Sequence, residues 1–174
     1  MPIHWIESNG GPYILMGIRA ASMWRATHGI SVESRDGCVD DYQCVCGIGG
    51  YAGVMHSGDN AILVIDDLPN DLAVYLNTDS EAVFVKWIGA ESEEKIWAAL
   101  DAEKELSFKR LDFELQITES ELVIFDSSDL LDDAGENKLY LNLLPGFYSV
   151  EVLDYEPHDE MMLQLFRLRR IRAL

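Results

Sequence analysis

Three pairs of adjacent aspartates are the residues in this sequence best suited to acid–base or metal chemistry. They are Asp40-Asp41, Asp66-Asp67 and Asp132-Asp133. Two carboxylates can serve as the acid and base of a glycosidase, or hold a divalent cation, provided that both face one cleft. Neighbouring residues on a strand point to opposite faces, so adjacency argues against a shared cleft. We interpret all three pairs as turn and strand-end aspartates.

Cysteine and histidine side chains offer a second kind of site, a zinc centre. Cys38, Cys44 and Cys46 lack the paired ligand spacing that is typical of zinc sites. The histidines share no period along the chain; they are His4, His28, His56 and His158. Three cysteines also differ from the larger, even number of a secreted disulfide framework. The sequence therefore predicts buried free thiols, no metal and no other cofactor.

Motifs that carry a nucleophile or bind a nucleotide are absent from the sequence. It contains no serine elbow, no P-loop, no dinucleotide-binding fingerprint and no HExxH motif. The glycine-rich stretch at residues 46–53, CGIGGYAG, could cradle a phosphate, but no Lys or Arg lies near it and no helix is expected after it. We interpret these glycines as strand ends and points of close sheet packing. The sequence predicts no catalytic residues.

Charge is the most informative total of the sequence. The 174 residues include 31 acidic and 13 basic side chains, which gives a formal net charge of −18. Such a field repels nucleic acid and membrane surfaces and speeds encounter with a basic partner. A solvated acidic surface without a partner explains the same composition. The sequence has no apolar run long enough to span a membrane and no secretion signal at its start, so we expect a cytoplasmic protein.

The acidic residues are concentrated in one part of the chain. Between Asp126 and Glu160 there are ten acidic side chains and a single basic one, Lys138. Most lie in two turn-like stretches, SSDLLDDAGEN and DYEPHDE. If the two turns meet at one end of a sheet, they form one anionic surface flanked by Tyr155. The predicted partner-binding residues are Asp129, Asp132, Asp133, Glu136, Asp154, Tyr155, Glu156, Asp159 and Glu160.

The elements that must position these residues are predicted to be mostly strands. The chain opens with an expected hairpin that turns at Asn9-Gly10-Gly11-Pro12, and residues 42–46 begin a strand-like run. One main helix is expected near residues 92–105, with acidic residues in its first turn. The other expected strands are 51–55, 61–65, 72–76, 82–88, 113–117, 122–125, 139–143, 148–153 and 161–168. The fold class is therefore mainly β, with some α.

Two stretches of the sequence repeat one pattern. Residues 58–67 read GDNAILVIDD and residues 118–127 read TESELVIFDS, so each places an aspartate after the same apolar strand. We predict a single domain over residues 1–174 with two related antiparallel, hairpin-rich units, about 51–90 and 111–168, packed together to bury one apolar face of each. The alternative is that two ordinary hairpins share a valine-rich strand.

Six features follow one another along the chain: WIESNGGPYILM, the tryptophan at position 24, DYQCVC, GYAGVMHSGDNAILVIDDLP, VKWIGAES and LVIFDSS. This ordered set resembles the immunity protein 21 family of bacterial polymorphic toxin systems. The resemblance covers most of the chain and implies a protein that binds and neutralises a cognate toxin, with no shared catalytic residues. The arginine-rich end and the long acidic segment of the chain are not part of the pattern, so the resemblance does not identify the partner.

Three classes of function stay open from the sequence. A binding inhibitor of a basic toxin, such as a nuclease, fits the charge and the absent motifs. An enzyme with a site assembled from distant strands would need a deep polar pocket with perturbed carboxylates. A regulatory or structural binding module with no toxin partner is the third class.

Overall fold

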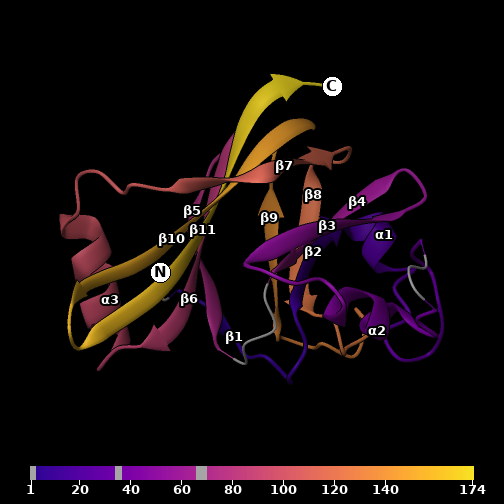
Figure 1. Cartoon of the computed structure of the whole chain (residues 1–174), viewed down its shortest axis with the longest axis horizontal. Helices are drawn as coiled ribbons and strands as arrows, with labels where there is room; N and C mark the ends of the chain where they lie inside the picture. The colour runs from indigo at the N-terminus through magenta and orange to yellow at the C-terminus, as the bar shows by residue number, and fades with distance from the viewer. Residues whose placement is uncertain (1–2, 34–36, 66–69) are drawn as a thin grey trace.

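The computed structural model describes residues 3–33, 37–65 and 70–174, and every structural statement below concerns these residues. They form two antiparallel sheets and three short helices, which confirms the predicted, mainly β fold class. Figure 1 shows the sheets next to each other, with helix α3 at the outer side of one and helices α1 and α2 at the outer side of the other.

The smaller sheet has five strands. Its order is β3-β4-β2-β8-β9, so β2 lies in the middle and pairs with both β4 and β8. The bounds of its strands are β2 (Tyr13–Gly17), β3 (Ala52–Ser57), β4 (Asn60–Ile65), β8 (Glu121–Asp126) and β9 (Lys138–Asn142).

The larger sheet has six strands in the order β1-β5-β6-β11-β10-β7. The long hairpin of β10 and β11 lies between β6 and the edge strand β7. The bounds of its strands are β1 (Trp5–Ile6), β5 (Leu72–Asn77), β6 (Glu81–Gly89), β7 (Lys109–Ile117), β10 (Gly146–His158) and β11 (Met161–Ala173).

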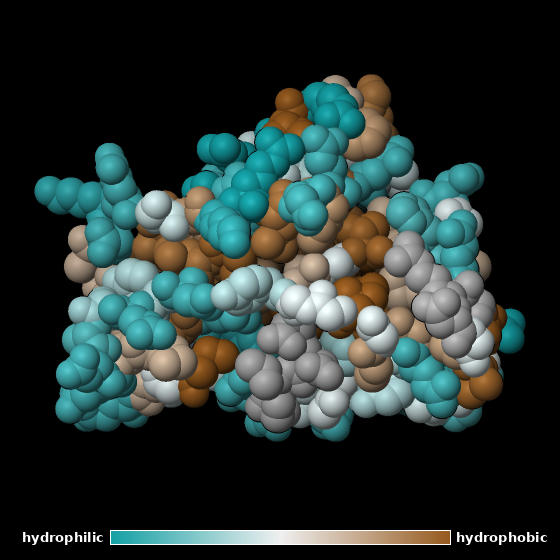
Figure 2. Space-filling view, in the orientation of Figure 1, coloured by the Kyte–Doolittle hydropathy of each residue, from teal (hydrophilic) through white to brown (hydrophobic). Residues whose placement is uncertain are grey.

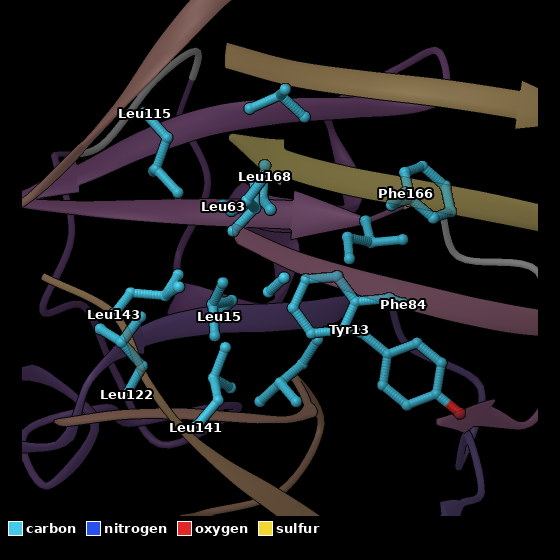
Figure 3. Packing of buried hydrophobic residues seen from close by; sticks show 14 of the residues in the cluster. Tyr13, Leu15, Leu63, Phe84, Leu115, Leu122, Leu141, Leu143, Phe166 and Leu168 are labelled. Atoms are coloured by element: carbon cyan, nitrogen blue, oxygen red, sulfur yellow. The ribbon is translucent and has the colours of Figure 1, made fainter. Parts of the chain in front are cut away.

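The main core lies between the two sheets. Alternation along each strand sends every second side chain inward, and the inward residues of both sheets are apolar. Phe84, Phe166 and Leu168 of the six-stranded sheet pack with Tyr13 and Leu63 of the five-stranded sheet, and all are fully buried (Figure 3). Burial of such large side chains is the main source of stability of the fold.

Each sheet also has a covered outer face. Helix α3 (Glu93–Ala102) covers part of the six-stranded sheet, where the Trp5 ring packs at a tilt against the rings of Trp87 and Trp97. The side chain of Ser92 caps this helix by accepting a hydrogen bond from the Lys95 backbone. On the five-stranded sheet, α1 (Ile18–Ala21), α2 (Asp41–Cys46) and the buried residues Trp24, Ala26 and Val32 between them cover the outer face. The main predicted helix is thus confirmed, and two shorter helices were not anticipated.

Three local predictions are wrong. The opening hairpin does not form, because β1 pairs with β5 in one sheet and β2 pairs with β4 and β8 in the other. Residues 42–46 are helical, because the Asp40 side chain caps α2 by accepting a hydrogen bond from the Gln43 backbone at 2.7 Å. The helical turn also brings Cys44 to Cys38, and the two form a disulfide with their Cα atoms 5.4 Å apart. The prediction of buried free thiols is therefore wrong for these two cysteines, and Cys46 is exposed.

The two segments of the proposed repeat contribute to both sheets in the same order. In each segment a pair of adjacent strands in the five-stranded sheet (β3–β4, β8–β9) is followed by a hairpin in the six-stranded sheet (β5–β6, β10–β11). The LVI strands β4 and β8 both lie next to β2. The preceding strands differ, since β3 pairs with β4 whereas β7 pairs with β10. Asp66 lies outside the described residues, and the repeat stays a prediction.

Candidate functional site

The predicted partner-binding residues lie in two separate places. Asp129, Asp132, Asp133 and Glu136 belong to the loop that joins β8 to β9. The second group, residues 154–160, belongs to the β10–β11 turn region of the other sheet. In Figure 1 this turn lies beside α3, at the far end of the molecule from α2. The structure therefore does not bring the two turns into one hollow.

The β8–β9 loop forms one wall of a surface hollow of about 390 Å³. We call it the acidic hollow, because four carboxylates line it and His4 is the single lining residue able to carry a positive charge. Its lining residues are His4, Trp5, Glu7, Asn9, Asp129, Asp133, Ala134, Glu136 and Asn137. Asp132 is exposed beside it on the same loop.

A buried aspartate at the end of β8 fixes the geometry of the acidic hollow. The Asp126 carboxylate is fully buried and accepts hydrogen bonds from the backbone N–H groups of Asn9 at 2.6 Å and Gly11 at 3.2 Å. It also accepts from the Ser8 hydroxyl at 2.9 Å and from the Ser128 backbone at 2.8 Å. Asp126 thus ties the N-terminal turn to the start of the acidic loop.

The far end of the loop is tied to the chain start by further hydrogen bonds. The Asn137 side chain accepts from the Glu7 backbone N–H and donates to the Glu7 carbonyl, both at 2.6 Å. His4 Nε2 lies 2.7 Å from the carbonyl oxygen of Glu136. These contacts hold Glu7 opposite the acidic loop, and sequence reasoning missed this residue because its partners are far away in the chain.

Burial disfavours the charge of Asp129 at the acidic hollow. It raises the pKa of the Asp129 carboxyl above its usual value, the Asn9 hydrogen bond lowers this pKa by less, and the charges of Asp126 and Asp133 raise it further. Burial and the nearby Glu7 carboxylate likewise raise the pKa of Asp71. A cationic side chain placed in the hollow would relieve this repulsion.

The second group of predicted residues has a different character. Asp159 and Glu160 line a shallow hollow of about 690 Å³ together with Lys95 of α3 and with His158. Figure 2 shows hydrophilic side chains gathered over this end of the molecule. Asp154 already accepts hydrogen bonds from Tyr51 at 2.7 Å and Gln164 at 3.0 Å. Lys95 and the hydrogen bonds of Asp154 thus offset more of the negative charge here than His4 offsets in the acidic hollow.

The other two predicted residues of this group, Tyr155 and Glu156, lie outside the shallow hollow. Tyr155 is 8% exposed and its hydroxyl donates to the Ala99 carbonyl at 3.3 Å, so the ring packs beneath α3. It therefore does not flank an exposed surface as predicted. Glu156 is exposed on β10 and lines neither hollow.

The chemistry available at the acidic hollow is the binding of cations. Among the described residues, no group of three or more His, Cys, Asp or Glu side chains has the arrangement of a metal site. In the same residues, no helix is long and apolar enough to cross a membrane. Lys and Arg are the side chains that pair with carboxylates of this kind.

Four of the segments that carry the family resemblance meet near Asp126, namely the N-terminal segment, Trp24, DYQCVC and LVIFDSS. The N-terminal turn binds Asp126, the Trp24 indole donates to the Ser127 carbonyl at 3.0 Å, and Tyr42 lies against Gly11. Residues 4–161 match the family model described as Immunity protein 21. No curated protein and no solved structure matches the chain. The matched part ends at the first residue of β11, so the arginine-rich strand lies beyond it.

Proposed function

This chain belongs to the immunity protein 21 family, and we propose that it neutralises a cognate bacterial polymorphic toxin by binding it, without catalysis. Family membership supports the class of function, and the acidic hollow supports a site for it. Four carboxylates around one hollow, with the charge of Asp129 disfavoured first by burial and then by Asp126 and Asp133, suit a partner that supplies positive charge.

The toxin in this proposal is basic, as a nuclease would be. A net charge of −18 steers a positively charged protein toward the acidic side chains and repels competing nucleic acid and membrane surfaces. We place the encounter in the cytoplasm, where a toxin that attacks nucleic acid acts. Nothing in the proposal requires a cofactor.

The primary docking surface in this proposal is the β8–β9 loop with Asp129, Asp132, Asp133 and Glu136, joined by Glu7. The exposed residues near the β10–β11 turn, Asp154, Glu156, Asp159 and Glu160, add to the long-range field. Rim charges of this kind act mainly on the association rate and its salt dependence.

A charge reversal tests the docking surface. Changing Asp132, Asp133 and Glu136 to lysine should slow association with the toxin by about tenfold at low salt, and by less at high salt, because exposed charges are screened. All three side chains are exposed, so the thermal stability should hardly change. The probe is the toxin domain encoded beside this gene, in a catalytically inactive form, and the measurement is binding kinetics at two salt concentrations.

A matched variant controls for net charge. Changing Asp59, Glu105 and Asp112 to lysine alters the charge equally, at exposed positions outside both hollows. If both triple variants slow association equally, only the total charge matters and the proposed surface is wrong. With the active toxin, inhibition by the wild-type protein should rise in proportion to the amount added up to equivalence. Complete inhibition by a small fraction of an equivalent would contradict binding without turnover.

A further inference from the structure

The disulfide between Cys38 and Cys44 is placed to control how helix α2 is held. The helix has six residues, and a helix this short is marginal without further support. Cys44 lies within it, and Cys38 lies before its first residue, at a sequence separation of 6 from Cys44. The bridge therefore closes a short loop around the start of α2 and limits how far the helix can unwind.

A disulfide in the cytoplasm, where we place this protein, is exposed to cellular dithiols. Disulfides that form there are usually transient and have a catalytic or redox-sensing role, because thioredoxin and glutathione keep thiols reduced. Cys44 is 7% exposed, whereas Cys38 is half-buried. We therefore expect a reductant to attack the bridge at Cys38.

The side chain of Tyr42 connects α2 to the acidic hollow. A Cβ atom on Gly11 would lie 2.9 Å from the Tyr42 ring, so the ring packs directly against this glycine. The Tyr42 hydroxyl points to the carbonyl oxygen of Gly10 at 3.5 Å. The same N-terminal turn carries Asn9, which lines the hollow and donates from its side chain to Asp129 at 2.9 Å. A change at α2 can thus reach the hollow through a continuous chain of contacts.

The start of α2 has supports that do not depend on the disulfide. The Asp41 backbone N–H donates to the Gly29 carbonyl at 2.9 Å, and the Tyr42 backbone N–H donates to the Ala26 carbonyl at 3.1 Å. The disulfide instead holds Cys44, farther along the helix. Opening the bridge should therefore loosen the helical turn that follows Tyr42 and leave the rest of the protein folded.

We propose that the Cys38–Cys44 disulfide is a redox switch that sets the affinity of the acidic hollow for the toxin, with the oxidised form binding more tightly. The proposal rests on the function proposed above and adds a means of regulating it. In the oxidised form the N-terminal turn is already in its binding geometry, so less ordering is needed when the toxin binds.

The reaction that operates the switch is thiol–disulfide exchange with a cellular dithiol. One thiolate of the dithiol attacks Cys38 Sγ, the bond to Cys44 Sγ breaks, and Cys44 leaves as a thiolate that takes up a proton. The second thiol of the dithiol then displaces Cys38 from the mixed disulfide. Two electrons and two protons pass from the dithiol to the protein, so the dithiol becomes a disulfide and both cysteines become thiols.

Binding of the inactive toxin domain to the two redox forms tests the proposal. Reduction with dithiothreitol should raise the Kd by roughly tenfold, and thermal unfolding should show that both forms are folded at the assay temperature. The double variant Cys38→Ser/Cys44→Ser should bind like the reduced wild type with or without dithiothreitol, which controls for effects of the reductant on the toxin. Cys46→Ser keeps the bridge and should show the same tenfold difference as the wild type.

A variant of Tyr42 tests whether the switch acts through this side chain. Tyr42→Ala should bind weakly in both redox forms, and the difference between the forms should fall below about twofold, because the connection is lost. Tyr42→Phe keeps the ring against Gly11 and should retain the difference. A tenfold difference that persists in Tyr42→Ala would overturn the proposed connection.

Hydrogen exchange reads the state of the switch without any toxin. The amides of Asn9 and Gly11, which bind Asp126, should exchange several-fold faster in the reduced protein, because the turn loses support from Tyr42. Equal Kd values for the two redox forms, or equal exchange at both amides, would overturn the switch while leaving the proposed function intact. If neither redox form binds the toxin, the proposed function fails and its regulation fails with it.

Discussion

Two fully buried aspartates and the aspartates of the acidic hollow use the same side chain in opposite ways. Asp41 accepts hydrogen bonds from the backbones of Arg25, Ser31 and Val32 and from the Ser31 hydroxyl. Asp126 likewise accepts four hydrogen bonds, at the end of β8. Both are fully buried. Each ties a loop that has no regular structure of its own to a strand or helix.

Asp129 and Asp133, a few residues beyond Asp126, have little of this support. Among the described residues, the Asp129 carboxylate accepts a hydrogen bond from the Asn9 side-chain amide at 2.9 Å. Burial, and after it the charges of Asp126 and Asp133, raises the pKa of this carboxyl. The number of hydrogen-bond donors at a carboxylate therefore separates the acidic side chains on which the fold depends from those of the acidic hollow. Removing a carboxylate with four donors leaves those donors unpaired, whereas removing one from the hollow relieves repulsion.

The largest expected effect is the loss of a buried aspartate. Asp41→Ala and Asp126→Ala should each lower the free energy of unfolding by roughly 3 kcal/mol, because several buried backbone donors lose their partner. Urea denaturation measures this difference. The free energy of unfolding of Asp133→Ala, at an exposed position of the acidic hollow, should stay within about 0.5 kcal/mol of the wild-type value. Similar losses in all three variants would show that the buried aspartates support the fold no more than Asp133 does.

A smaller effect is expected from crowding the Asp126 carboxylate without removing it. A Cβ atom at Gly11 would lie 2.6 Å from Asp126 Oδ1, 2.7 Å from Ser127 Oγ and 2.9 Å from the Tyr42 ring. Gly11→Ala should therefore destabilise the protein by about 1 to 3 kcal/mol, measured by thermal or urea unfolding. Gly89→Ala, which meets nothing within 4 Å, is the matched control and should unfold like the wild type. Equal stability of the two variants would show that the packing around Asp126 is loose.

The parts of the fold that follow from local patterns could be predicted from the sequence. Alternating apolar residues in β7, β9 and β11 and the acidic first turn of α3 after Ser92 depend on neighbours within a few residues. The sequence predicts a strand at residues 42–46 because Cys44, Val45 and Cys46 favour strands. The signal for helix α2 is Asp40, a capping residue three positions before Gln43.

The rest depends on contacts between distant residues. The turn at Asn9-Gly10-Gly11-Pro12 reads as a hairpin turn, but Asp126 binds it from 115 residues away in the chain and directs β1 and β2 into different sheets. The acidic loop was recognisable from its composition, whereas its pairing with Glu7 follows from the hydrogen bonds of Asn137. The two acidic turns lie on separate sheets. Their distance from each other depends on how the sheets pack, which the local sequence pattern does not show.

The smallest expected effect, and the sharpest test of the comparison, is Asp129→Asn. The pKa of Asp129 in the folded protein is raised, so the folded state holds its proton more tightly than the unfolded state does. The stability that this proton gives is fully present below the unfolded pKa, about 4, and is lost as pH rises through the folded pKa. At neutral pH the ionised carboxylate therefore destabilises the protein. Asparagine keeps an acceptor for Asn9 and carries no charge.

Asp129→Asn should accordingly be slightly more stable than the wild type at pH 7, by a few tenths of a kcal/mol because the site is partly exposed and screened. The gain should shrink as pH falls toward about 4, where the wild-type carboxyl becomes protonated. Thermal unfolding across this range measures it, with Asp132→Asn, on the exposed part of the loop, as control. The same variant should associate more slowly with the toxin, since it removes a charge from the hollow. A carboxylate whose loss raises stability and weakens binding is one that the fold does not require and the partner does. Lower stability at pH 7, or an unchanged association rate, would place Asp129 with Asp41 and Asp126 as a residue that serves the fold.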